Sequence, residues 1–299
     1  MMQELVTQEH PTREHLTPWQ AVQATTDQQV LALWMHGHKH SAATVDAYTR
    51  DIPHFLDFVG KDLRTVTLGD VQAYKDALQA LPEATADRRL AAVKSLFTFA
   101  QKLGYLIFNP AALVKLPKRK ETLAQRIMSE CDAHRMIALE PDNRNRILLR
   151  LLYASGVRVS ELCGLKWKDC QERPDGGQVS VLGKGDKTRA IYLSTSTWQD
   201  LVSLKGGAAE EEPVFWSKKT HGHLDRTQVF RIVQAAAKRV GLKANVSPHW
   251  LRHAHASHAI DHGAPLHVVQ ATLGHESLKT TGAYLHARPQ ESSSRYLSV

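Results

Sequence analysis

The 299-residue chain lacks several features that would place it in a membrane or in an oxidising compartment. No apolar run approaches the roughly 18 residues that suggest a membrane-spanning helix. The N-terminal stretch has no apolar segment of the signal-peptide kind, so we expect no leader. Only three cysteines occur, Cys131, Cys163 and Cys170, and none forms a CxxC pair. We therefore expect a protein of a reducing interior, without disulfide bonds.

Positive charge is what the chain has in excess. The 38 lysines and arginines outnumber the 30 aspartates and glutamates, which gives a formal net charge of +8. A basic balance favours a polyanionic partner, most simply nucleic acid, although charge alone leaves open a merely basic protein. The length favours two domains, and a composition of 42% hydrophobic and 23% charged residues is typical of globular proteins.

The N-terminal part of the chain has the apolar spacing of amphipathic helices. Thr67 and Asp70 have the spacing of a capping box, in which each side chain binds the other residue's backbone amide. Residues 1–23 are polar and unpatterned, and we expect them to be flexible. Short connections between the helices predict a small helical domain over 24–108. The predicted helices span 26–38, 41–60, 67–78 and 85–104.

Residues 109–126 combine two prolines with a concentration of basic side chains, and we interpret them as a linker. Most basic runs are simply solvated. A linker between two domains can instead cross a phosphate backbone, where each cation contributes salt-sensitive affinity. We hypothesise DNA contacts from Lys115, Lys118, Arg119 and Lys120.

The second half, 127–299, mixes helices with one small group of strands and ends in a tail. Short strands are expected within 167–193, with the glycine-containing segment 183–187 as a hairpin turn. Helices gathered around a single small sheet predict an α+β domain, and the whole chain is expected to be mostly α with a small β-sheet. The predicted helices span 145–156, 159–165, 224–240, 248–262, 265–273 and 277–286.

Five histidines lie between Ser247 and Gly263, in one predicted helix. His249 and His253 have the i, i+4 spacing of zinc-binding helices, but the glutamate of an HExxH motif is missing. Arg252 lies between them, and a guanidinium cannot bind a metal cation. We therefore predict no metal site, which leaves a histidine-rich surface or part of an active site.

His249 and Arg252 share one helix face and suit phosphoryl transfer, in which positive charge must be placed on a phosphate. One such pair is weak evidence, but companions occur along the chain. Arg158 and Glu161 follow a glycine turn, and Lys184 lies in the predicted hairpin turn. Further on, His275 follows a glycine and precedes Tyr284 by nine residues.

This ordered set resembles the tyrosine recombinase, or phage integrase, family, and most closely its simple Xer-like members. The family's Arg, Lys, His-x-x-Arg, second His and Tyr fall here on Arg158, Lys184, His249, Arg252, His275 and Tyr284. The resemblance covers roughly 24–290. It implies a helical, SAM-like core-binding domain followed by a catalytic domain, which together clamp duplex DNA.

The resemblance also implies a mechanism. Tyr284 attacks a scissile phosphate to form a 3′-phosphotyrosyl link, while the two arginines and His275 bind the phosphate oxygens. His249 is our candidate base, Lys184 protonates the 5′-oxygen, and Glu161 supports the site. No metal or other cofactor is implied. Lys187 is an alternative to Lys184, and we expect the remaining histidines to be packing or surface residues: His253, His255, His258, His262 and His267.

Two other functions remain open at this point. A type IB DNA topoisomerase uses a similar residue set and reseals the same strand as a monomer. A protein of the same fold could also bind DNA without catalysis. The recombinase reading implies paired half-sites, a homo-tetramer or a hetero-tetramer with a related recombinase, and action on nucleoid DNA in the cytoplasm. Resolution of dimers and integration or excision of a mobile element both fit this reading.

Overall fold

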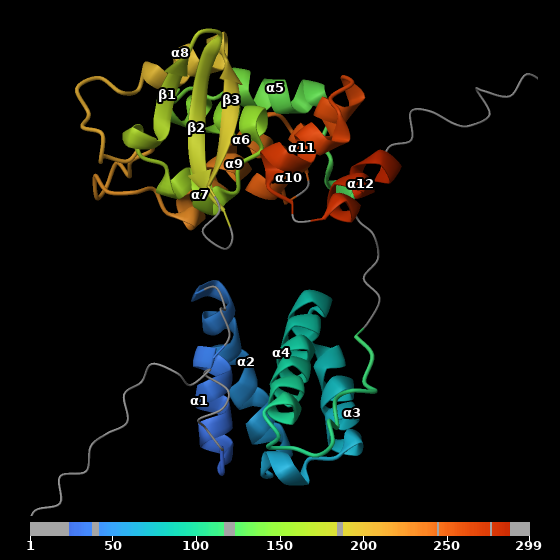
Figure 1. Cartoon of the computed structure of the whole chain (residues 1–299). Helices are drawn as coiled ribbons and strands as arrows, with labels where there is room; N and C mark the ends of the chain where they lie inside the picture. The colour runs from blue at the N-terminus through green and yellow to red at the C-terminus, as the bar shows by residue number, and fades with distance from the viewer. Residues whose placement is uncertain are drawn as a thin grey trace, which may run out of the picture. The chain divides into compact units, whose positions relative to one another are not determined.

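The computed structural model describes residues 24–37, 42–116, 123–183, 188–243, 245–275 and 277–287. The chain divides into two compact units, Met1–Arg119 and Lys120–Val299 (Figure 1). The boundary falls within the basic segment expected to link two domains. Within the ranges above, no helix combines the length and the apolar character that crossing a membrane requires.

Four α-helices form the described part of the N-terminal unit, as the apolar spacing predicts (Figure 1). Their core combines aliphatic and aromatic side chains, and Phe55 meets Tyr74 and Phe97 edge to face, with ring centroids 5.1 and 5.7 Å apart. The capping box at Thr67 and Asp70 is present. The helices are α1 (Asp27–Gly37), α2 (Ala42–Val59), α3 (Leu68–Ala77) and α4 (Glu83–Lys102), with 3-10 turns η1 (Leu63–Thr65) and η2 (Leu78–Ala80).

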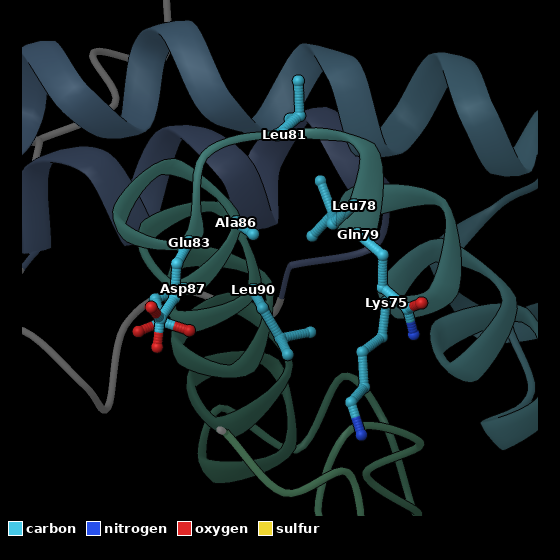
Figure 2. Close-up of a pocket in the computed structure, with 8 residues that line it drawn as sticks. All are labelled: Lys75, Leu78, Gln79, Leu81, Glu83, Ala86, Asp87 and Leu90. Carbon is cyan, nitrogen blue, oxygen red and sulfur yellow. The ribbon is translucent and has the colours of Figure 1, made fainter. Parts of the chain in front are cut away.

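A pocket of about 270 Å³ lies where η2 joins α3 to α4 (Figure 2). Leu78, Leu81 and Leu90 make much of its lining apolar, and Lys75 and Asp87 also border it. This lining offers an apolar hollow but no cluster of reactive groups.

The C-terminal unit packs helices against a three-stranded antiparallel sheet, as expected for an α+β domain (Figure 1). The strands are β1 (Cys170–Arg173), β2 (Gly176–Leu182) and β3 (Thr188–Ser194). The helices are α5 (Glu130–Ala138), α6 (Asn143–Ser155), α7 (Val159–Gly164), α8 (Thr195–Val202), α9 (Arg226–Arg239), α10 (Pro248–Asp261), α11 (Leu266–Leu273) and α12 (Leu278–Ala287), with 3-10 turns η3 (Ala124–Arg126) and η4 (Trp167–Asp169).

The sheet has the order β1-β2-β3, and Val179 of β2 pairs with Ile191 of β3. Helix α8 packs on β2 so closely that a Cβ on Gly177 would lie 2.0 Å from the Trp198 ring, so only glycine fits there. Helix α6 contacts α5, α8 and α10, and its leucines are fully buried. This central helix ends at the candidate site.

Helices α5 and α8 are not among the elements that the sequence predicts. Both are short, with nine and eight residues. The side chains of Ser129 and Ser194 accept hydrogen bonds from backbone amides at their N-termini. A serine cap is a common feature of loops as well, so this local signal did not separate a two-turn helix from a connection.

Candidate active site

The site is built where two helices end in glycine. Gly156 ends α6 and Gly274 ends α11, both in the left-handed conformation, with φ of 61° and 64°. A Cβ on Gly156 would lie 2.6 Å from the His255 ring and 2.8 Å from Leu273, so glycine is needed for conformation and for space. The two glycines turn the chain directly into Arg158 and His275.

Arg252 of α10 ties these two helix ends together. Its guanidinium donates to the carbonyl oxygens of Gly156 and Leu273, the latter at 2.6 Å. The carbonyls at a helix C-terminus carry partial negative charge and favour a cation. Only 5% of Arg252 is exposed, and burial followed by the neighbouring Arg158 lowers its pKa to about 10. Arg252 therefore stays charged at neutral pH.

Glu161 joins two further arginines. It accepts hydrogen bonds from Arg158, at 2.9 Å from Nη1, and from both terminal nitrogens of Arg189, at 2.8 and 2.7 Å. Burial alone would raise the pKa of Glu161, but the bonds from Arg189 and from the Arg158 backbone amide hold it below its ordinary value. Glu161 is thus the shared carboxylate of Arg158 and Arg189.

Arg158 and Arg189 also reach the turn around Gly274. Arg158 Nη2 donates to the Gly274 carbonyl at 3.2 Å, and Arg189 Nε donates to the Thr272 carbonyl at 2.8 Å. The three guanidiniums and the single carboxylate give this cluster a charge of 3 − 1 = +2. The positive excess is suited to an incoming phosphodiester.

Tyr284 of α12 is 6% exposed, and its ring packs with Ile127, Val269 and Leu273. Its hydroxyl oxygen lies 2.9 Å from Nδ1 of His253. Burial raises the pKa of Tyr284 above its ordinary value, and the charge of Arg252 offsets only part of that effect. The hydroxyl therefore needs a proton acceptor before it can act as a nucleophile.

The other histidines of the predicted set lie around Tyr284 without binding its hydroxyl. The His275 ring is parallel to the Tyr284 ring, with centroids 6.4 Å apart, and its Nδ1 lies 2.9 Å from Oγ1 of Thr281. His249 is exposed, and its ring centroid lies 6.4 Å from that of His253. The sequence analysis expected His253 to be a packing or surface residue, whereas the structure places it on the tyrosine.

His249 and His253 line an open pocket of about 420 Å³ beside the site. Arg126, Asn245, Ser247 and Trp250 complete its lining. The pocket gives solvent or a substrate a route to the two imidazoles.

Lys184 and its alternative Lys187 lie outside the described residues, between the end of β2 at Leu182 and the start of β3 at Thr188. Lys115 is described and exposed, while Lys118, Arg119 and Lys120 lie outside the described ranges. The structure thus brings together Arg158, Glu161, His249, Arg252, His275 and Tyr284, and adds Arg189 and His253.

A metal site would need several ligating side chains close together in the ranges that the structure describes. Within those ranges, no group of three or more histidine, cysteine, aspartate or glutamate side chains is arranged to hold a metal ion. The donors around Tyr284 are instead guanidiniums and imidazoles, a set that binds anions.

Replacing Glu161 with alanine is expected to lower the free energy of unfolding by about 3–5 kcal/mol, because it leaves the partly buried Arg158 and Arg189 without their counter-charge. Only 4% of the Glu161 side chain is exposed. Glu211 is a matched control, since it also bridges two cations, Lys166 and Lys168, but is 66% exposed. Chemical denaturation should show little change for Glu211→Ala. Equal losses in the two variants would contradict the prediction.

Stability of the C-terminal unit is expected to fall with pH below 6.5. Burial, with nearby cations, lowers the pKa of His253 and His275 from 6.5 to about 4, and burial does the same for His255. Between pH 6.5 and about 4 the unfolded chain binds protons that the folded chain does not bind. The contribution of these histidines to stability is therefore fully present above pH 6.5 and decreases as the pH falls toward 4. Each pH unit costs up to about 1.4 kcal/mol for a buried histidine.

Melting temperatures measured by circular dichroism from about pH 8 to about pH 5 test this expectation. Carboxylates contribute mainly below about pH 4.5, so the upper part of the window belongs to the histidines. His255→Asn keeps a donor near the Tyr153 carbonyl, which lies 2.8 Å from His255 Nδ1, and should reduce the slope. A melting temperature that is constant across the range would contradict the assignment.

Comparison with known proteins places the chain in a family. The phage integrase family model matches residues 119–291, and the N-terminal SAM-like domain of phage integrases matches residues 33–104. The chain is 33% identical over 269 residues to a tyrosine recombinase of Thermosipho africanus, covering 86% of this chain and 93% of that protein. It is 34% identical over 259 residues to tyrosine recombinase XerC of Xylella fastidiosa, covering 82% and 86%.

Solved structures share the fold over most of the chain. XerH recombinase, bound to its palindromic difH substrate after cleavage, superposes with a TM-score of 0.70 at 19% identity, covering 91% of this chain and 84% of XerH. A lambda integrase fragment bound as a dimer to a core site superposes with a TM-score of 0.70 at 21% identity, covering 89% and 97%. The family models and the curated relatives show that this chain belongs to the phage integrase family and is a tyrosine recombinase.

Proposed function

We propose that this recombinase cuts and rejoins duplex DNA at specific sites through a 3′-phosphotyrosyl link on Tyr284. One observation carries the proposal: the buried Tyr284 feels the charge of Arg252, which belongs to a cluster of three guanidiniums with a single carboxylate, Glu161. A phosphodiester would neutralise part of the excess charge and meet the nucleophile in the same place. Placing positive charge on a developing phosphorane is the main task in phosphoryl transfer.

Arg158 and Arg252 bind the non-bridging oxygens of the scissile phosphate. A guanidinium has five N–H donors, and each of these arginines spends two on the protein, which leaves three for the substrate. The bonds to Glu161 and to the helix ends fix the planes of the two guanidiniums before the DNA arrives. Because of this preorganisation, the guanidiniums need not reorient in the transition state, which avoids a free-energy cost.

His249 and His275 provide further donors to the phosphate, and Lys184 protonates the departing 5′-oxygen. Tyr284 displaces that oxygen, and a 5′-hydroxyl from a partner strand later displaces Tyr284. The phosphotyrosyl bond retains the energy of the broken phosphodiester, so the reaction needs no nucleotide cofactor. The arginines supply the positive charge that a metal ion supplies in other phosphoryl-transfer enzymes.

The assembly proposed for this reaction is a tetramer on two DNA sites, of one chain or of this chain with a related recombinase. Exchange between two duplexes requires four cleaved strands and therefore four active sites. A similar fold has been solved as a lambda integrase tetramer on a Holliday junction, which supports the arrangement. We expect one subunit on each half-site.

The two units clamp the DNA, and the basic linker contacts its backbone through Lys115, Lys118, Arg119 and Lys120. Such contacts carry no sequence information and should weaken as salt is raised. The place of action is the nucleoid DNA of the cytoplasm. Resolution of DNA dimers and integration or excision of a mobile element remain alternatives within this function.

Sequencing the DNA that becomes covalently attached to the protein in cells tests the proposed function. We expect one recurring sequence with two inverted half-sites, and exchange of flanking DNA when two copies are supplied in vitro. A type IB topoisomerase would instead relax supercoiled DNA without exchanging flanks, and an accessory protein would yield no covalent DNA. Either of these results would contradict the proposal.

Lys184→Ala is expected to impair cleavage of ordinary DNA and to recover on DNA with a 5′-bridging phosphorothiolate, because a thiolate leaves without a proton. Arg158→Ala should not recover, since its loss affects the phosphate and not the leaving group. Single-turnover cleavage of both substrates provides the measurement. Equal defects of Lys184→Ala on the two substrates would remove it from the acid role and favour Lys187.

A further inference from the structure

Among the side chains that the structure describes, one imidazole is hydrogen-bonded to the hydroxyl of Tyr284. Nδ1 of His253 lies 2.9 Å from the hydroxyl oxygen, and the two ring centroids are 5.8 Å apart. His253 belongs to α10 and Tyr284 to α12, and these helices are in contact. The distance is that of a well-formed hydrogen bond between an oxygen and a nitrogen.

The surroundings of His253 keep its imidazole neutral, which is the state that can accept a proton. Burial is the main reason that the pKa of His253 is lowered to about 4. The charges of His249, Arg126 and Arg252 lower the pKa further. With the ring proton on Nε2, Nδ1 accepts the phenol's hydrogen bond. An incoming phosphodiester brings negative charge that opposes these cations, so the basicity of His253 should rise when DNA binds.

The other two imidazoles of the site are less well placed. His275 uses Nδ1 toward Thr281 and lies parallel to the Tyr284 ring, a position that does not address the hydroxyl. His249 is exposed and lines the open pocket, where it can face a phosphate oxygen. The geometry thus places His253 on the nucleophile and leaves His249 and His275 as the histidines that can face a phosphate.

We propose that His253, one position after Arg252, is the catalytic base that takes the proton of Tyr284, a role that rests on the proposed function. As the Tyr284 oxygen bonds to phosphorus, its proton moves to Nδ1 of His253. The bond from phosphorus to the 5′-oxygen breaks, and that oxygen takes a proton from the general acid. During rejoining, His253 returns the proton to the departing tyrosine.

His253→Ala is expected to cleave a suicide substrate about 10²- to 10⁴-fold more slowly in single turnover, the range for losing a general base, with DNA affinity unchanged. Added imidazole should restore part of the rate by entering the vacated space. His258→Gln is the matched control, because His258 also lies on α10, with Nδ1 2.9 Å from the Tyr153 hydroxyl. It should cleave at the wild-type rate. Melting temperatures confirm folding, and His253→Gln replaces the alanine variant if that variant unfolds.

A fluorinated tyrosine at position 284 provides a second, independent measurement. Its phenol has a lower pKa and depends less on a base, so it should recover much of the rate of the His253 variants but not that of Arg158→Ala. Cleavage by His253→Ala at or above the wild-type rate would overturn the proposal and leave His253 as a residue that only holds the resting tyrosine. If the fluorinated tyrosine restored the cleavage rate of His249→Ala but not that of His253→Ala, the base would be His249. A wild-type protein that forms no adduct would instead overturn the proposed function.

Discussion

Tyr284→Phe is expected to abolish the covalent protein–DNA complex and to leave DNA binding and folding intact. The substitution removes one oxygen, while the phenyl ring keeps its packing with Ile127, Val269 and Leu273. The lost hydrogen bond to His253 should cost only about 0.5–1.5 kcal/mol of stability. Catalysis, by contrast, loses its nucleophile, so no residual adduct should form on a suicide substrate in a denaturing gel.

Tyr153→Phe gives a matched control for this experiment. The Tyr153 hydroxyl also lies 2.9 Å from a histidine on α10, His258, so both variants remove a partly buried phenol–imidazole pair. Burial raises the pKa of Tyr153 to about 12, as it raises that of Tyr284 above its ordinary value. Only Tyr284 lies close enough to Arg252 for the charge to act on it. Adduct formation by Tyr284→Phe, or its loss in Tyr153→Phe, would reject the nucleophile assignment.

Most of the fold follows from local patterns in the sequence. Apolar residues at helical spacing predict α1 to α4, and the glycine-containing turn between alternating segments predicts the hairpin of β2 and β3. The patterns miss α5 and α8, whose serine caps also suit loops. They also place the starts of α4 and α6 two residues too late, since these helices begin at Glu83 and Asn143.

The sequence predicts only part of the arginine cluster. Arg158 and Glu161 are three residues apart, and their pairing is visible from spacing alone. Arg189 is 28 positions from Glu161, in a strand with ordinary alternation, and nothing local connects the two residues. Its partners depend on how β3 packs beside α11, which is a property of the folded domain.

In the sequence, His253 stands out only as half of a histidine pair at i, i+4. Its i, i+4 relation to His249 suggested a metal pair, and Arg252 between them argued against one. The same spacing places both imidazoles on one face of α10. Only the docking of α12 on that face brings the Tyr284 hydroxyl to His253 instead of His249.

Arg252→Ala is expected to slow cleavage of bound DNA by about 10²-fold or more, the effect of removing one preorganised donor to a developing anion. It should also lower stability by about 1–3 kcal/mol for each buried carbonyl left without a partner, here those of Gly156 and Leu273. Ground-state affinity should change far less, because many phosphate contacts lie elsewhere on a DNA clamp.

Arg252→Lys separates charge from geometry in this prediction. Lysine keeps the positive charge, but one ammonium cannot reproduce a planar fork that reaches two helix ends and a phosphate at once. We therefore expect the lysine variant to recover part of the stability and little of the rate. Binding by gel shift, denaturation and single-turnover cleavage at saturating protein measure the three quantities separately. If affinity collapsed in Arg252→Ala while bound complexes were cleaved at the wild-type rate, Arg252 would be a DNA-binding residue and the transition-state role would pass to Arg158 alone.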